Sequence, residues 1–332
     1  MWLRVVTRPE GSTDGVRIAR PWIWAGTIPL ALALLIGCAS VNPMPFQEFS
    51  KSAQDIRTGA DKVLETDYEM ARERMLRNAK TDPGTAIKQL TIDRAVGPQG
   101  EVKDFAWTMT GEPLFLTIRR YRRGVDDFNS VLVAYAQGLA NLAGPVTMTN
   151  EQVTEMASNL TTNAKEAARG LQLDVNQDKL ALFSTVAVGA FQQYLVSKQR
   201  SDLRKALVEN QEWIVEVSRL GGEASKNMAT ALWQEFLALQ NDMNAKIATA
   251  GAGARPTAIE EKIALNEKFV DQLEALKTLD NAYANVPTAH AELSASLQAG
   301  PFSLESIREL SALGKRLERL YQKLKKQDAG GS

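Results

Sequence analysis

The sequence is poor in the side chains that build metal centres and nucleophilic active sites. Among 332 residues there is one cysteine, Cys38, and one histidine, His290. A disulfide needs two cysteines, and a metal held by nitrogen or sulfur needs several ligands. We therefore expect no disulfide framework, no metal site and no cofactor. Because His290 follows Pro287 near the expected start of a helix, we expect it at the surface or in a helix cap.

The chain also lacks an excess of charge of either sign. It carries 39 basic and 39 acidic residues, and its formal net charge is zero. Nucleic-acid binding domains usually show a clear basic surplus, and a strong field of one sign is needed to steer a charged partner. The composition therefore argues against nucleic acid as a partner.

No catalytic motif is recognisable. The glycines between residues 84 and 111 are too scattered to form a phosphate-binding loop. The stretch Asp174–Asp178 alternates oxygen-bearing side chains as a calcium loop does, but Lys179 occupies the required glycine position and Thr185 that of the final glutamate. We expect a non-enzymatic protein, and an enzyme is only our third reading of the sequence.

Proline and glycine are few, at 12 and 22 residues, and they cluster between long stretches that contain neither. In those stretches apolar residues recur every three or four positions, which predicts helices with one buried face. The pattern predicts an all-α, elongated, mostly antiparallel bundle of about six to seven helices. Its main segments are residues 46–80, 114–142, 150–171, 180–220, 228–247, 257–283 and 302–324.

Within this bundle the clearest seam runs from Leu114 to Leu142 in strict steps of four and three residues. Thr149 followed by Gln152 is a capping-box pattern and predicts the start of the next helix. We expect Gly221-Gly222 to end one helix and Pro287 to precede a short one. In the segment that starts at Thr257, the positions expected on the buried face are Ile259, Ile263, Phe269, Val270, Leu273, Leu276 and Tyr283.

Residues 84–112 break the helical pattern. A turn at Gly97-Pro98-Gln99-Gly100 precedes a segment in which Phe105, Trp107 and Met109 would share one face of an extended strand. We expect a small hairpin or an ordered loop here, between the first two long helices. These three residues are candidates for contact with a membrane or partner, and the alternative is that they only pin the loop to the bundle.

The segment Leu180–Val196 is apolar on nearly every side of the expected helix and includes Phe183, Val186 and Phe191. A helix of this kind is either enclosed by protein or placed in lipid. At about 17 residues it lies at the lower limit for a membrane span. We favour a central helix of the bundle, and keep these three residues as candidate membrane or partner contacts.

The amino-terminal region reads as a secretory leader. Arg17 and Arg20 precede an apolar run, Trp22–Gly37, which is short for a transmembrane helix. The run ends in Leu35-Ile36-Gly37-Cys38, which resembles the lipobox of bacterial lipoproteins. An uncleaved anchor, or a cleaved leader with Cys38 as a free thiol, are the alternatives.

The resemblance implies that residues 1–37 are removed, that the sulfur of Cys38 takes a diacylglyceryl group, and that the new amino terminus receives a fatty acid such as palmitate. Residues 38–45 would then be a lipidated tether, 46–326 the helical bundle and 327–332 a flexible tail. In a Gram-negative envelope, Ala39 in place of aspartate implies the periplasmic face of the outer membrane.

From these features we expect a membrane-anchored, non-enzymatic scaffold that binds another envelope protein through its long helices. Heptad seams also serve homo-oligomers, so self-association stays open. The alternative is a membrane-active protein that uses segment 180–196, because a bundle with one apolar segment is similar in architecture to α-helical pore-forming toxins of the cytolysin A type.

Overall fold

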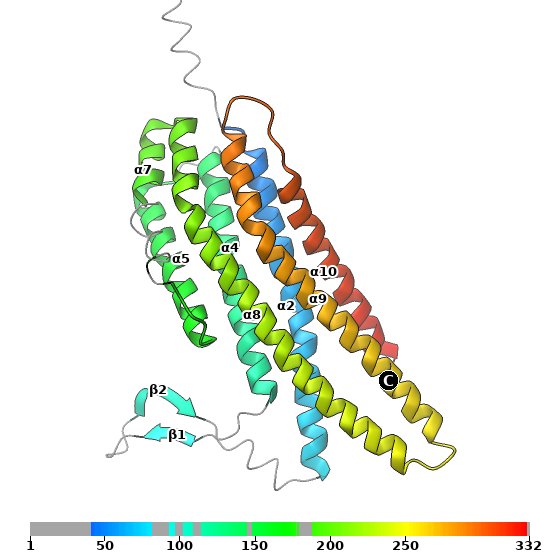
Figure 1. The fold of residues 1–332 in the computed structure, drawn as a ribbon. Helices are drawn as coiled ribbons and strands as arrows, with labels where there is room; N and C mark the ends of the chain where they lie inside the picture. Colours follow the sequence, from blue (N-terminus) through cyan, green and yellow to red (C-terminus); the bar gives the residue numbers. More distant parts are fainter. Residues whose placement is uncertain are drawn as a thin grey trace, which may run out of the picture. The chain divides into compact units, whose positions relative to one another are not determined.

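The computed structural model describes residues 41–81, 93–96, 102–108, 114–144, 148–176, 178 and 188–330, and within these ranges the chain is an all-α multi-helix bundle with one β-hairpin (Figure 1). Residues Ser40–Ser332 belong to one compact unit. Its elements are α2 (Met44–Thr81), β1 (Asp93–Val96), β2 (Val102–Thr108), α4 (Leu114–Ala143), α5 (Asn150–Gly170), α7 (Val188–Ser197), α8 (Arg200–Thr249), α9 (Arg255–Ser296) and α10 (Glu305–Gly330).

The centre of the bundle is formed by α2 and α9. Each packs on the other and on α8 and α10, while α4 packs on α2 and α8, and α5 and α7 complete the side of α4 and α8 (Figure 1). Ion pairs between Arg57 and Asp126 and between Arg122 and Asp61, both at 3.1 Å, show that α4 runs antiparallel to α2. Antiparallel neighbours dominate, as the short connections predict.

The expected seam of α4 lies in the core. Ile118, Val125, Phe128, Tyr135 and Leu139 are each 0% exposed. The capping box at the start of α5 is also confirmed, because the side chains of Thr149 and Gln152 each bond the other's backbone N–H. The strict sequence periodicity therefore identified a real packing surface.

A hairpin does lie between α2 and α4, as the sequence predicted. β1 and β2 pair antiparallel, with Asp93 opposite Thr108 and Val96 opposite Val102, and the register shifts between Arg94 and Val96. Phe105 and Trp107 are on β2, and Met109 lies outside the described residues.

The prediction that one helix continues from segment 180–196 to Gly221-Gly222 was wrong in two places, at Lys198 and at the two glycines. Residue Lys198 adopts a φ of 52°, which breaks the chain into α7 and α8. The two glycines lie inside α8, which is 50 residues long. At Gly221 a Cβ atom would stand 2.4 Å from the Tyr283 ring of α9. This glycine therefore marks a close approach of two helices and not a helix end.

The prediction of a helix boundary at Pro287 was also wrong, because Pro287 lies inside α9. Proline removes one backbone donor and usually interrupts a helix. Here its carbonyl accepts a hydrogen bond of 3.0 Å from Nε2 of Gln211 on α8. One side chain of the neighbouring helix thus ties α8 to α9 at the proline.

A pair of substitutions tests the close contact at Gly221. Gly221→Ala should lower the free energy of unfolding by up to about 2 kcal/mol, because overpacking against Tyr283 costs about 1–3 kcal/mol and alanine returns about 1 kcal/mol of helix propensity. Gly222→Ala is the matched control. Its nearest obstacle is the mobile Asp280 carboxylate at 3.0 Å, so it should be neutral or stabilising. Urea unfolding of both variants measures the difference, and equal stabilities would contradict the assignment.

Candidate functional site

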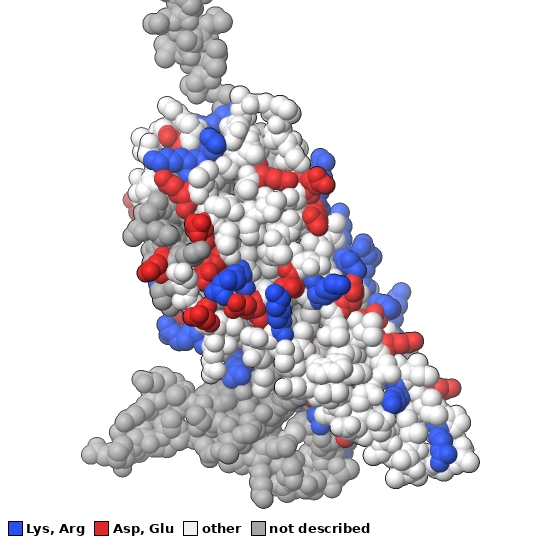
Figure 2. Space-filling model, in the orientation of Figure 1, with Lys and Arg blue, Asp and Glu red and all other residues white. Residues whose placement is uncertain are grey.

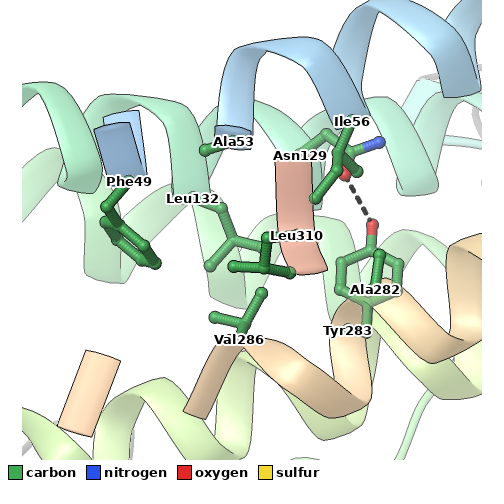
Figure 3. Close-up of a pocket in the computed structure, with 9 residues that line it drawn as sticks. All are labelled: Phe49, Ala53, Ile56, Asn129, Leu132, Ala282, Tyr283, Val286 and Leu310. Atoms are coloured by element: carbon green, nitrogen blue, oxygen red, sulfur yellow. Dashed lines mark hydrogen bonds between the residues drawn. The ribbon is translucent and has the colours of Figure 1, made fainter. Parts of the chain in front are cut away.

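The pocket between α2, α4, α9 and α10 is too small to hold a ligand. Figure 3 shows its lining of mostly apolar side chains, with the Tyr283 hydroxyl donating to Oδ1 of Asn129 at 3.0 Å. The cavity volume is about 10 Å³. This is about the space that one water molecule needs, so we interpret the cavity as a packing gap. Among the residues that the structure describes, no group of three or more potential metal ligands comes together.

His290 is a core residue, and the expectation of a surface or capping position was wrong. It is 0% exposed, its Nε2 lies 2.8 Å from the Tyr135 hydroxyl, and its Nδ1 lies 2.7 Å from Oε1 of Gln211. The amide nitrogen of Gln211 donates to Pro287, so its oxygen accepts from Nδ1–H, and Nε2 accepts from the tyrosine. Burial lowers the pKa of His290 to about 3. The ring is therefore neutral and links α4, α8 and α9.

Asp67 of α2 is a second buried titratable group, and burial shifts its pKa upward instead of downward. It is 0% exposed, and burial raises its pKa to about 7, against smaller opposing effects of Lys268 and Gln272 on α9. Neither carboxylate oxygen makes a hydrogen bond of normal geometry to the described part of the chain. A carboxyl group in this position is most stable when it is protonated.

The surface feature that stands out is on the α8–α9 hairpin, in the half nearest the turn that joins the two helices. Five large apolar side chains are 43–62% exposed there, and we call them the distal strip: Trp233, Leu237, Ile259, Ile263 and Val270. The part of Figure 2 that corresponds to this half of the hairpin is largely white, with few charged groups.

The register of the hairpin places these residues on one face. Hydrogen bonds join Gln240 to Asn266 and Lys262 to Asn244, which sets residues near 236 opposite residues near 269. The rings of Phe236 and Phe269 stack there with centroids 3.8 Å apart, and Trp233 packs against both. Residues spaced by four or eleven positions share a helix face, which fits 233 with 237 and 259 with 263 and 270.

This face points away from α2. Glu235 bonds Arg74 of α2 at 3.0 Å, and it lies two positions, or about 200°, from both Trp233 and Leu237. On α9, Val270 lies two positions from both Lys268 and Gln272, the residues that act on Asp67 of α2. The distal strip is therefore the outer face of the hairpin, and α2 covers the inner one.

The residues predicted from sequence as contacts have different positions. Phe191 is 0% exposed on α7, so in this conformation it is a core residue. Cys38, Met109, Phe183 and Val186 lie outside the described residues. The distal strip was not predicted from the sequence, because Ile259, Ile263 and Val270 have the spacing of a buried face and turn out to be exposed. The excess of apolar positions on residues 228–273 was the available signal.

No helix in the described ranges is long and apolar enough to cross a membrane. Comparison of the chain with known protein families, with curated proteins and with solved structures found no match. The assignment of function therefore rests on this molecule's own residues.

The two buried titratable groups predict opposite dependences of stability on pH. The fold keeps Asp67 protonated, so this contribution is fully present below pH 3.8 and is lost as the pH rises to about 7. The fold keeps His290 neutral, so this contribution is present above pH 6.5 and is lost as the pH falls to about 3. Each group changes the free energy of unfolding by on the order of 4–5 kcal/mol over its pH range. Because the two pH dependences have opposite signs, they should nearly cancel between pH 4 and 6.5.

Single variants should separate the two effects. In Asp67→Asn the free energy of unfolding should rise with pH from 4 to 6.5, because only His290 is left. In His290→Gln it should fall from pH 4 to 7. Urea unfolding at half-unit pH steps measures both slopes, and the double variant is the control for the remaining carboxylates. Parallel slopes in the two single variants would contradict the assignment.

Proposed function

We propose that this protein is a lipid-anchored, non-enzymatic lipoprotein of the cell envelope that presents the distal strip to a protein partner. The observation that carries the proposal is the strip itself. Contiguous exposed apolar patches are uncommon on monomeric proteins and mark interaction sites. Exposed tryptophan set on other aromatic rings, as Trp233 is on Phe236 and Phe269, is typical of residues that contribute most to binding.

The position of the strip relative to the start of α2 supports a partner outside the lipid. Only five residues separate Cys38 from Met44, where α2 begins. From Met44 to Arg74, which bonds α8 beside the strip, α2 rises about 45 Å at 1.5 Å per residue. If Cys38 is lipidated, the membrane lies at one end of α2 and the strip lies level with the other.

The end of the bundle near Met44 has features that fit proximity to a membrane. Met44 and Phe302 are 45% and 39% exposed, and they border an open hollow that Arg308 also lines. Apolar side chains next to a cation suit the interface between lipid and water. The distal strip, in contrast, has amide neighbours, which suit a protein surface better than a lipid headgroup.

The first test is the chemistry of Cys38. Mass spectrometry of the protein purified from membranes should find a chain that begins at residue 38 and carries a diacylglyceryl group and a fatty acid. Cys38→Ala should keep the leader and lose acylation, with an unchanged far-ultraviolet circular dichroism spectrum. An unmodified thiol in a chain that retains the leader would refute the anchor.

The second test concerns the strip. Ile263→Glu should abolish cross-links between this face and its partner in intact membranes while the protein stays folded, because the side chain is 52% exposed. Val208→Glu is the matched control, since Val208 is 55% exposed on α8 but lies outside the strip. A similar loss in both variants, or in neither, would refute the strip as the binding surface.

A further inference from the structure

We propose that the partner of the distal strip is a second copy of this chain, and that two α8–α9 hairpins pack face to face as a four-helix bundle with both turns pointing the same way. This inference rests on the proposed function, because it names the partner of that same surface. It is argued from charge, direction and area.

The charges on this face allow self-association. The exposed residues that accompany the strip on the same outer face are mostly uncharged, namely Gln234, Asn241, Asn244, Ala248 and Asn266, and the one acid among them is Glu267, one turn from both Ile263 and Val270. A two-fold interface brings the same patch together from both copies, so a patch of one sign would repel itself. Amide groups both donate and accept hydrogen bonds, so they can pair across such an interface.

The border of the strip nearer the middle of the hairpin has both signs. Lys226 of α8 lies 3.6 Å from Asp280 of α9, and Arg219 bonds Glu223 along α8. When one copy turns by 180° about an axis parallel to the helices, its α9 faces α8 of the other. Lys226 of one copy then lies level with Asp280 of the other, and the exposed Lys277, two turns from Val270 on α9, adds a second cation to this border.

Anchoring determines the direction of the pair. If both copies are attached through Cys38 to one membrane, their α2 helices rise from it in the same direction, and the two-fold axis is parallel to the helices. Residues at equal height then oppose each other. Trp233 and Leu237 of one copy meet Val270 of the other, and Ile263 meets the polar residues Asn241 and Asn244.

The area explains why the pair should depend on the membrane. With the uncharged residues beside it, the strip extends from Trp233 to Ala248 of α8, or about 24 Å, and two helices of about 10 Å diameter give about 480 Å² per copy. The total of about 960 Å² is below the usual size of a stable, specific interface. Confinement to one membrane raises the effective concentration, which favours an interface too weak for dilute solution.

The test uses the full, lipidated chain in its own membranes. There the Cys38 sulfur is a thioether, so an introduced cysteine is the sole thiol of the mature chain. A Leu237→Cys copy and a Val270→Cys copy with tags of different size are co-expressed and oxidised. The disulfide-linked product that contains both tags should exceed, by at least tenfold, the product of a matched Val208→Cys and Val270→Cys pair.

The control pair is informative because residue 208 lies about 44 Å along α8 from residue 237, while both side chains are exposed. Adding Ile263→Glu to both copies should reduce the mixed disulfide at least tenfold without a change in circular dichroism. An equal yield from the two cysteine pairs would overturn the second-copy proposal.

The outcomes also separate this inference from the proposed function. A bifunctional thiol–amine reagent can also link the cysteine at 237 or 270 to a neighbouring protein. If that reagent gives the only cross-link, and the linked protein has a different mass from this chain, the second copy is refuted and the strip is retained as a partner-binding surface. If neither position links to any protein, both proposals fail.

Discussion

The contact between Tyr283 and α8 is the interaction on which the rest of the bundle depends. The tyrosine ring packs where Gly221 provides no side chain, and its hydroxyl donates to Asn129 of α4. One side chain thereby fixes the spacing of α8, α9 and α4 at the middle of the molecule. Gln211 adds a second tie between α8 and α9 by donating to the carbonyl of Pro287, and both helices continue past the two places where their sequences favour a break. The long hairpin, and hence the distal strip, exists because both helices continue.

The sequence was sufficient where a local pattern and its partner agree. The α4 seam and the Thr149–Gln152 cap were correct, because each depends on residues three or four positions apart. It failed where the outcome depends on what packs opposite. Gly221-Gly222 and Pro287 are helix-ending signals in isolation, and His290 looks exposed until Tyr135 and Gln211 are known to surround it. These partners lie 62 to 155 positions away, and one sequence does not show them.

The same limit explains why the candidate site was missed. Periodicity shows that residues share a face but not whether a neighbouring helix covers that face. Ile259, Ile263 and Val270 have the spacing of core residues, and they stay exposed because α2 packs on the other side of the hairpin. Conversely, the apolar residue Phe191 is enclosed. Apolar spacing alone therefore does not separate exposed faces from enclosed ones, and the packing of the neighbouring helices decides between them.

The proposed anchor has a mechanical consequence, because only five residues separate Cys38 from Met44, the first residue of α2. If Cys38 is lipidated, a feature about 45 Å along α2 is carried above the membrane while the anchor diffuses in the membrane plane. Diffusion of the anchor in the membrane plane would then move the distal strip within a thin layer of solvent at a fixed height above the membrane. Partners at that height would be met often, while those close to the bilayer or deep in the solvent would be passed by.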